Sequence, residues 1–219
     1  MRPIAKVLYL WIVYCLSYAE MDQRRFVAEI DIETKMNNLE NELTALKALV
    51  GHTYIRWGRT ICQPVNGTEL LYSGYMVGDK WDQSGGGSNN LCIPEVPTWG
   101  QYVDGYNGGA EIRGTEIESD ATVSNLLFGK AVDNHDVPCA VCRSNRASHV
   151  MIPGRTTCYP GWTEEYRGYV VASKPTWASN SDYICLDSMM EFVAHGAGND
   201  NEHVVRPAEV RCGSIPCPP

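Results

Sequence analysis

The sequence has no apolar run long enough to cross a membrane. A spanning helix needs about 20 apolar residues, whereas the most apolar stretch, residues 7–16, is much shorter. Arg2 and Lys6 precede this stretch, and Ser17-Tyr18-Ala19 follows it with small residues at positions −3 and −1 of a cleavage site. This order is typical of a secretory signal peptide. We therefore expect residues 1–19 to be a signal peptide and the mature protein to be secreted.

Basic residues are also scarce, because 18 Lys and Arg face 26 Asp and Glu and give a formal net charge of −8. Removal of the signal peptide takes away Arg2 and Lys6, so the charge of the mature protein becomes −10. Such acidity argues against binding to nucleic acid or to anionic membranes. We expect neither of these partners and no insertion into a membrane.

Catalytic motifs are missing as well. There is no Gly-x-Ser-x-Gly nucleophile elbow, and the histidines lack the His-x-x-x-His and His-Glu-x-x-His spacings of metal sites. The sequence therefore predicts a protein that is not an enzyme, with no catalytic or metal-binding residues. Oxygen ligands gather at residues 198–202 without the twelve-residue loop of a calcium site. We expect a solvated loop there and no cofactor, with calcium as the alternative. The histidines are His52, His135, His149, His195 and His203.

Cysteine, by contrast, is plentiful, and of the 9 cysteines Cys15 lies in the signal peptide. The rest are even in number, and we expect an oxidising compartment to pair them all. Cys139 and Cys142 have the Cys-x-x-Cys spacing of redox enzymes, but Pro138 lies in turn-rich, β-like surroundings instead of at the start of a helix. We therefore expect structural disulfides and neither a redox nor a zinc site. The cysteines concerned are Cys62, Cys92, Cys139, Cys142, Cys158, Cys185, Cys212 and Cys217.

Residues 20–51 differ in character from the rest and contain neither Gly nor Pro before their last position. Apolar side chains alternate there at spacings of four and three residues, which is the a/d pattern of a coiled coil. Lys35 and Glu42 lie at g positions, from which they can reach Glu40 and Lys47 of a parallel neighbour. We expect a coiled-coil oligomerisation stalk and a homotrimer; the alternative is a single amphipathic helix lying on the globular domain. The core positions are Ile32, Met36, Leu39, Leu43, Leu46 and Val50.

The region after the stalk is β-like, because glycine is frequent and short strand-length runs alternate with turn-rich stretches. Residues 105–133 are expected to be an irregular connection with one strand at residues 124–128. Three motifs recur in the same order about 95 residues apart. We therefore expect a mainly β fold of two related, disulfide-stapled lobes, residues 52–150 and 151–219, around a pseudo-two-fold axis. The matching motifs are residues 58–64 with 154–160, 72–75 with 166–169, and 91–93 with 184–186.

The repeat also bears on the disulfides, since equivalent cysteines should have equivalent partners. Spacing alone fixes no connectivity among so many cysteines. The repeat favours a Cys62–Cys92 bridge together with a Cys158–Cys185 bridge. The other four cysteines would then pair among themselves, across the lobes or within one.

Several stretches of the β-like region are long and distinctive. They read Tyr-Ile-Arg-Trp-Gly-Arg-Thr (54–60), His-Asp-Val-Pro-Cys-Ala-Val-Cys-Arg (135–143), Met-Ile-Pro-Gly-Arg (151–155), Cys158 followed by Gly-Trp-Thr (161–163), and Arg-Cys-Gly-Ser-Ile-Pro-Cys-Pro-Pro (211–219). In this order they resemble the C-terminal non-collagenous domain of sponge short-chain collagens. The resemblance covers residues 52–219. It implies an extracellular, trimer-forming module related to the terminal domain of type IV collagen.

The sequence departs from that family in two respects. A collagen needs Gly at every third position, and the coiled-coil segment takes the place of any such run. In the family a further Cys-x-x-Cys pair tends to follow the region of Pro218-Pro219, where the sequence ends. We therefore expect the second lobe to lack counterparts of Cys139 and Cys142. This leaves open whether the lobe closes differently or those two cysteines take other partners, an interchain bridge included.

Some side chains are candidates for modification or binding. Asn66 begins the one Asn-x-Ser/Thr acceptor of the chain and is expected to be glycosylated. Trp81, Trp99 and Trp177 lie in polar, loop-like sequence and are candidates for stacking on sugars or anchoring partners. Trp57 and Trp162 are expected to fill the lobes' cores.

These observations favour a structural or interaction protein of the extracellular matrix. In this hypothesis a coiled coil holds several β-rich heads together, and the heads bind matrix proteins or glycans multivalently. The alternative is a lectin-like recognition protein that binds glycans through the loop aromatic residues.

Overall fold

The computed structural model describes residues 3–215, and among them the side chains of residues 14, 18–47 and 50–215. Contacts divide the chain into two compact units, Met1–Val50 and Gly51–Pro219. Cys217 and most side chains of the expected signal peptide, Cys15 included, lie outside this description, so the predictions about them stay predictions.

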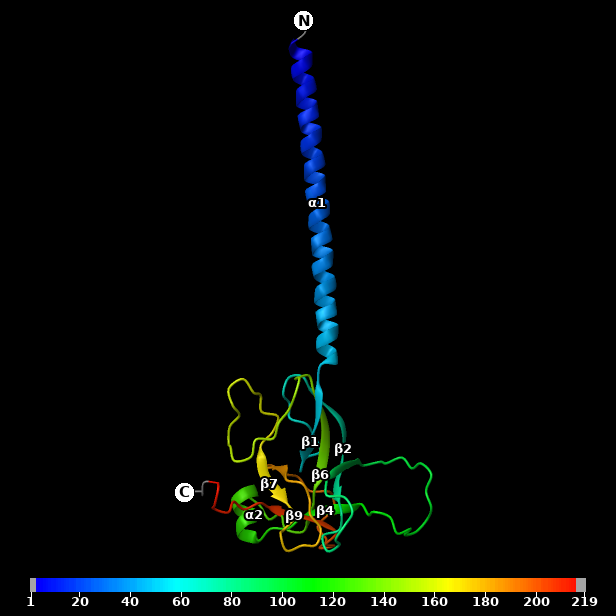
Figure 1. Ribbon diagram of the computed structural model, residues 1–219, viewed down its shortest axis with the longest axis vertical. Coiled ribbons are helices and arrows are strands. Elements are labelled where there is room, and N and C mark those ends of the chain that lie inside the picture. The colour runs from blue at the N-terminus through cyan, green and yellow to red at the C-terminus, as the bar shows by residue number, and fades with distance from the viewer. Residues whose placement is uncertain (1–2, 216–219) are drawn as a thin grey trace. The chain divides into compact units, whose positions relative to one another are not determined.

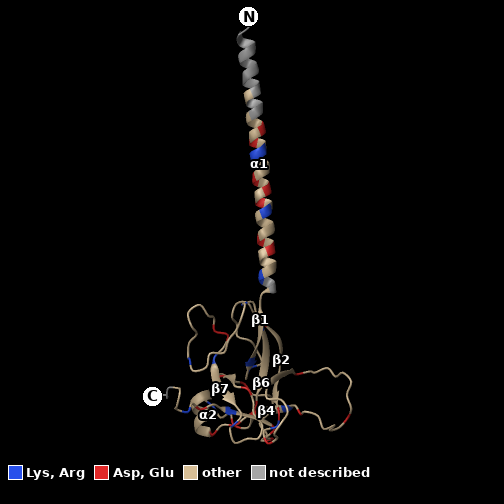
Figure 2. Cartoon of the chain, in the orientation of Figure 1, with Lys and Arg blue, Asp and Glu red and all other residues tan. Residues whose placement is uncertain are grey.

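The first unit is one helix, α1 (Pro3–Leu49) (Figure 1). Proline is tolerated at the first position of a helix, and the next helix breaker in the sequence is Gly51. Charges of both signs are distributed along the helix (Figure 2). Lys35 pairs with Asp31 of the same chain at 2.7 Å, and both side chains are largely exposed, so this pair contributes little. The expected stalk is therefore helical, whereas its association with other chains stays a prediction.

No helix in the described residues combines the length and the hydropathy that a membrane span requires.

The second unit is mainly β, as predicted, and its strands close into a barrel. Following the pairings, the order β2, β6, β1, β8, β7, β9 and β4 returns to β2, so seven strands of the described chain form a ring. β3 and β5 pair outside the ring with β2 and β4. The strands are β1 (His52–Trp57), β2 (Thr68–Gly78), β3 (Leu91–Pro94), β4 (Arg113–Ile117), β5 (His135–Asp136), β6 (Pro138–Ser144), β7 (Gly168–Ala172), β8 (Ile184–Asp187) and β9 (His203–Pro207).

One short helix, α2 (Ala121–Phe128), lies where the sequence predicted a strand. That prediction was wrong because the caps decide the local structure. The Asp120 side chain accepts a hydrogen bond from the backbone N–H of Val123, and Gly129 ends the helix in the left-handed conformation with φ of +67°. An aspartate N-cap and a glycine after the last turn are strong helix boundaries.

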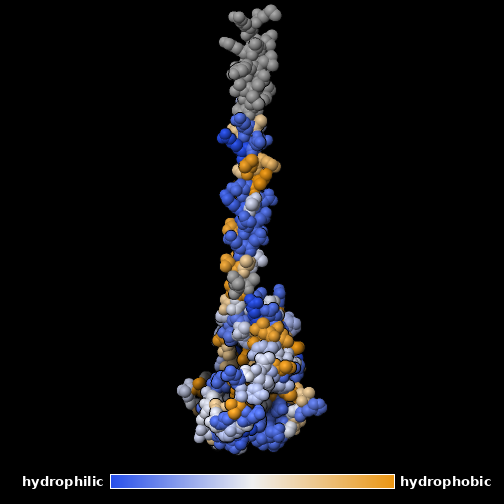
Figure 3. Space-filling model, turned by 90° about the vertical axis from the view of Figure 1, so that its right-hand side faces the viewer, coloured by the Kyte–Doolittle hydropathy of each residue, from blue (hydrophilic) through white to orange (hydrophobic). Residues whose placement is uncertain are grey.

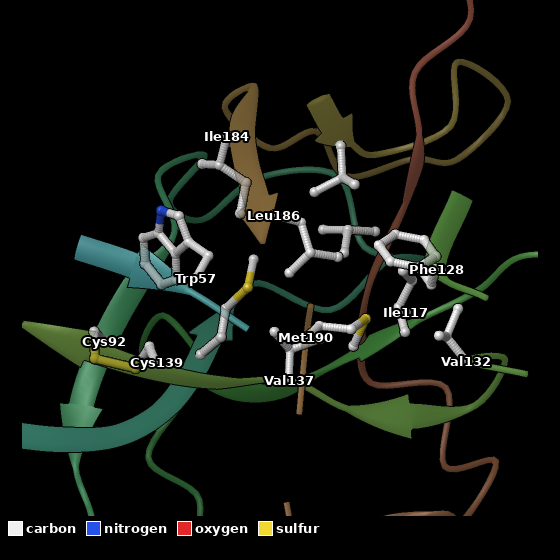
Figure 4. Close-up of a cluster of buried hydrophobic side chains, with 13 residues drawn as sticks. Trp57, Cys92, Ile117, Phe128, Val132, Val137, Cys139, Ile184, Leu186 and Met190 are labelled. Atoms are coloured by element: carbon white, nitrogen blue, oxygen red, sulfur yellow. A yellow bond between two sulfur atoms is a disulfide. The ribbon is translucent and has the colours of Figure 1, made fainter. Parts of the chain in front are cut away.

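The core lies inside the barrel, where side chains from several strands meet (Figure 4). Trp57 is buried there, as predicted, beside Ile184 and Leu186. Trp162, which was also expected in the core, is 47% exposed. The correction follows from its position: it lies outside every strand, so no sheet carries its side chain inward.

The hairpins β2–β3 and β7–β8 pair in the same register. Met76 lies opposite Cys92 in the first hairpin, and Val170 lies opposite Cys185 in the second. A close approach also recurs: a Cβ on Gly74 would meet the carbonyl oxygen of Ile93, and a Cβ on Gly168 would meet that of Leu186. Glycine is needed at both positions because any side chain would collide with the backbone of the partner strand.

The disulfides overturn the predicted pairing. Cys62 is bonded to Cys142, and Cys92 is bonded to Cys139, so Cys62 and Cys92 are not partners. β6 lies between β1 and β2 and pairs with both. Residues three apart on a strand point to opposite faces, so β6 directs its two cysteines to two different partners.

The expectation that every cysteine after the signal peptide would be paired is also corrected. Cys158 and Cys185 are free thiols. Cys212 is disulfide-bonded.

Candidate functional site

The second unit carries a groove of about 940 Å³. Residues 146–158 and residues 161–168 both contribute to its lining. Side chains of β1 and β8, together with Val141 of β6, Val170 of β7 and Tyr183, complete the lining. The loop between β6 and β7, which supplies most of these residues, projects from the barrel in Figure 1.

Both free thiols, Cys158 and Cys185, line this groove. Burial raises the pKa of the Cys185 thiol to about 11, and the charge of Asp187 adds to the effect. Thiolate is the reactive form of cysteine, so Cys185 stays protonated and reacts slowly near neutral pH. Cys158 comes from the loop, whereas Cys185 is fixed on β8, so the two thiols reach the groove from different elements.

Tyr166 connects two of the walls. Its hydroxyl lies 3.1 Å from the carbonyl oxygen of Ile55 on β1 and 2.9 Å from that of Cys185 on β8. The hydroxyl donates to one of them at a time. Burial holds the pKa of Tyr166 well above its usual value. The hydroxyl therefore remains a donor over the whole physiological range.

A buried ion pair lies next to the groove and joins β1 to β8. The Arg56 guanidinium donates to Asp187 Oδ2 at 2.7 Å, and both side chains are almost fully buried. Arg56 also donates to the carbonyl oxygen of Ile61 at 2.9 Å, and the backbone N–H of Met189 donates to Asp187 Oδ1 at 2.7 Å. Such complete pairing is needed because an unpaired buried charge is very costly.

Polar side chains also line the groove, among them Arg146, His149 and Glu165. Arg146 forms an ion pair with Glu165 and donates to Thr68 Oγ1 at 2.8 Å. His149 stacks on His52 with ring centroids 4.7 Å apart. Burial lowers the pKa of His149, and the charge of His52 lowers it further. His149 therefore stays neutral to a lower pH than an ordinary imidazole.

The predicted aromatic sites fall into two separate places. Trp81 and Trp177 pack against each other, with ring centroids 5.9 Å apart in a T-shaped contact. Trp99 is instead 78% exposed, on the long loop between β3 and β4 that also exposes Tyr102 and Tyr106. This loop, green in Figure 1, projects from the barrel. The three tryptophans therefore do not form one binding platform.

The expected glycosylation site is accessible. Asn66 is an exposed turn residue immediately before β2. Thr68 of the same acceptor is held by Arg146, which also donates to the carbonyl oxygen of Asn66 at 3.1 Å. Attachment of a glycan to Asn66 stays a prediction.

The five histidines and the acidic loop at residues 198–202 were considered as metal ligands in the sequence analysis. Among the described residues, no group of three or more His, Cys, Asp or Glu could hold an ion. The backbone N–H groups of Asp200 and Asn201 instead donate to Glu116 Oε1 at 2.9 Å each. His203 is buried against Thr115, with 2.7 Å between Nδ1 and Oγ1. The segment 198–202, for which calcium binding was the alternative to a solvated loop, thus helps to hold a buried carboxylate.

Sequence reasoning missed the groove and its thiols. It assigned Cys158 and Cys185 to each other, and it placed Trp162, which lines the groove, in the core. The repeated motifs contained a clue. They match Cys158 with Cys62 and Cys185 with Cys92, but no counterparts of Cys139 and Cys142 were expected after residue 151.

Comparison with known proteins gives no assignment. No family model matches the chain, and no solved structure matches it. The resemblance to sponge short-chain collagens therefore stays a hypothesis that rests on the motifs alone.

Proposed function

We propose that this is a secreted structural or interaction protein of the extracellular matrix, oligomerised through α1 and presenting several β units together. The observation that carries the proposal is the apolar stripe of α1. Its core positions Ile32, Met36, Leu39, Leu43, Leu46 and Val50 are between 46% and 63% exposed in the single chain. In Figure 3 orange patches interrupt the blue surface along the described part of the helix (Figure 3).

Self-association would remove this apolar surface from water. Full burial of one such side chain contributes about 1.5–3 kcal/mol, and the stripe has the narrow a/d spacing of a coiled-coil seam. Ile32 at a d position and Leu43 at an a position favour three strands. A homotrimer is therefore the proposed assembly.

The disulfides Cys62–Cys142 and Cys92–Cys139 indicate an oxidising compartment, as expected for an extracellular protein. The excess of Asp and Glu over Lys and Arg, with a formal net charge of −8, is compatible with a matrix setting. Matrix proteins or glycans are the proposed partners, and three linked heads would raise weak affinities by avidity.

The β unit is proposed to consist of two related lobes, residues 52–150 and 151–219. The equal registers of the hairpins β2–β3 and β7–β8 support this interpretation, as do the matched glycines Gly74 and Gly168. Together with the motifs, they favour the kinship to the terminal domain of type IV collagen that the sequence resemblance implies.

The assembly is tested by light scattering on the size-separated secreted protein. We expect a trimeric mass for the wild type and a monomeric mass for Leu43→Asp, because a charge at a core position opposes burial. Asn41→Asp is the matched control: it introduces the same charge two residues away, at a position facing solvent, and should leave the trimer intact. A monomeric wild type, or equal dissociation by both variants, would refute the stalk.

A lectin-like protein is the second proposal, and the loop between β3 and β4 favours it. Trp99, Tyr102 and Tyr106 are all more than 70% exposed there, and exposed aromatic rings can stack on sugars. A glycan array with the native oligomer tests it. Binding that Trp99→Ala abolishes supports the lectin, and no binding to any glycan excludes it.

A further inference from the structure

Helix α1 carries a second group of apolar side chains besides the a/d stripe. Phe26, Val27 and Ile30 are 64%, 60% and 48% exposed. With 3.6 residues per turn they lie about 120–160° around the helix from Ile32, which begins the stripe. They therefore point away from the stripe, and the proposed trimer leaves them in water.

These residues begin a face without charge that runs along the helix. Its members recur at spacings of four and three residues, which is the pattern of a helix packed lengthwise against another helix. All of them are exposed in the single chain. We call this surface the outer face, and it consists of Gln23, Val27, Ile30, Thr34, Asn37, Asn41 and Thr44.

The lack of charge distinguishes the outer face from the flanks of the helix. Residues 20–47 carry seven acidic and four basic side chains, and none of them lies on the outer face. The solvated face of a coiled-coil helix normally carries charges of alternating sign. An uncharged face with exposed apolar side chains at one end instead indicates an interaction surface.

The polar members of the outer face are compatible with burial in a contact. The hydroxyls of Thr34 and Thr44 donate to the carbonyl oxygens of Ile30 and Glu40 at 2.8 Å and 2.7 Å. These hydroxyls therefore keep a partner when water is removed. Each asparagine amide of the face both donates and accepts, so it can pair with the same amide of another copy.

The partner that fits this face is α1 of a second copy. The spacing requires a helix lying alongside, and α1 is the one long helix of the described chain. The chain has a formal net charge of −8, so its copies repel each other unless they meet through an uncharged surface. The outer face meets this condition, and against itself it places apolar side chains on apolar side chains.

The flanking charges favour a parallel arrangement. Glu33 and Glu40 lie on the same flank of the outer face. A parallel copy in register brings opposite flanks together, so that Glu33 meets Asn38 and Glu40 meets Ala45. An antiparallel copy would place Glu33 opposite Glu40, and these like charges repel.

We propose that the outer face of α1 binds the outer face of α1 in a second trimer, side by side, parallel and in register. The outer face is then the contact between stalks, whereas the a/d stripe builds each trimer. The proposal rests on the proposed stalk and extends it from one trimer to a lateral array. Each trimer presents three outer faces, so one stalk can contact several neighbours.

The contact between stalks is weaker than the contact within a trimer. The outer face has Val27 and Ile30 at its core positions with Phe26 beside them, whereas all six core positions of the a/d stripe are apolar. Trimers therefore form at the lower concentration, and lateral association follows at the higher one. The two steps can be measured separately.

The test is a concentration series of the full secreted chain in sedimentation-velocity centrifugation. We expect a trimeric mass in dilute solution and growth to multiples of that mass as the concentration rises. Ile30→Glu should keep the trimer and raise the concentration of half-maximal growth at least about tenfold, because a charge is costly inside a contact. Circular dichroism should show the same helicity for both proteins.

Mixing two variants tests whether residue 30 of one copy faces residue 30 of the next. Ile30→Glu and Ile30→Lys should each fail to grow alone and should grow when mixed at low ionic strength, because opposite charges then meet. Asn41→Lys is the matched control. It places the same charge on the same face, where an antiparallel copy would bring it opposite residue 30, and mixed with Ile30→Glu it should restore no growth.

Three results would overturn the proposal while leaving the stalk intact. They are a wild type that stays trimeric at every concentration, equal growth of the wild type and Ile30→Glu, and rescue of Ile30→Glu by Asn41→Lys instead of by Ile30→Lys. A monomeric wild type in dilute solution would refute the stalk itself, and this proposal with it.

Discussion

The hairpins β2–β3 and β7–β8 share their register and a tyrosine contact. The hydroxyl of Tyr72 donates to the carbonyl oxygen of Cys92 at 3.0 Å, and that of Tyr166 lies 2.9 Å from that of Cys185. The two cysteines nevertheless differ, since Cys92 is bonded to Cys139 whereas Cys185 is a free thiol. The local sequence produces the same hairpin register twice. Cys92 is oxidised because β6 lies beside β2 and brings Cys139 to it, whereas Cys185 has no such partner in the described chain.

The largest expected effect concerns the contact that joins the two halves. Asp187→Ala leaves the buried Arg56 guanidinium without its counter-ion, so we expect a loss of about 3–5 kcal/mol in the free energy of unfolding. Urea denaturation followed by tryptophan fluorescence measures this loss.

An exposed pair within the second half provides the control. Glu164 and Arg167 lie 2.8 Å apart, and the Arg167 side chain is 68% exposed. Glu164→Ala should cost at most about 1 kcal/mol, because solvent screens such pairs. Equal losses in the two variants would show that the Arg56–Asp187 pair does not link the halves.

The second effect concerns the cysteines directly. Replacing Cys92 and Cys139 together by alanine removes a disulfide and should cost about 2–4 kcal/mol. Replacing Cys158 and Cys185 together by serine should change the stability by less than about 0.5 kcal/mol, because no bond is lost. Both double variants are compared by thermal and urea unfolding. A large loss in the second variant would mean that the free thiols already stabilise the fold.

The third effect is pH dependence at the other contact between the halves, where β4 pairs with β9. Burial lowers the pKa of His203 from 6.5 to about 4. Between pH 6.5 and about pH 4 the unfolded chain therefore binds more protons at His203 than the folded chain does. The stability that the neutral imidazole contributes is present at neutral pH and is lost as the pH falls through this range. We expect a loss on the order of 2–3 kcal/mol.

The carboxyls nearby act in the opposite sense. Burial raises the pKa values of Glu116 and Asp136, so their protonation favours the folded state at acid pH. His203→Gln keeps both carboxyls and removes only the imidazole. Its unfolding free energy should fall less between pH 7 and pH 4 than that of the wild type. Parallel pH curves would contradict the assignment to His203.

The smallest effect compares the two tyrosine hydroxyls. Tyr72→Phe and Tyr166→Phe should each cost about 1 kcal/mol, the net value of one hydrogen bond. Tyr166→Phe should cost more, because its hydroxyl is buried while Tyr72 is 38% exposed. Unfolding curves of the two variants under the same conditions measure the difference. A larger loss in Tyr72→Phe would contradict this order.

Much of the fold could be predicted from local pattern. A heptad stripe without Gly or Pro predicts a helix, and α1 forms over that segment. The glycine-rich texture predicts a β unit, and Trp57 was correctly placed in its core. The strand predicted at residues 124–128 was wrong, because the caps Asp120 and Gly129 outweigh a short apolar run.

The site was harder to predict, because it depends on which distant strands become neighbours. Cys62 and Cys142 are 80 residues apart in sequence, and spacing contains no information about that pairing. Trp162 resembles a core residue by its motif, but its segment has no strand beside it and stays at the surface. Trp81 and Trp177 both looked like loop aromatics, and only the packed structure brings them together.

The sequence by itself determined the helical segment, the β character of residues 52–219 and the repeated motifs. These follow from periodicity and from side-chain chemistry, which act over short distances along the chain. The tertiary structure alone decided the disulfide partners and the groove. β6 pairs with both β1 and β2, whereas residues 148–153 and 162–167 form no strand and line an open groove together with the free thiols Cys158 and Cys185.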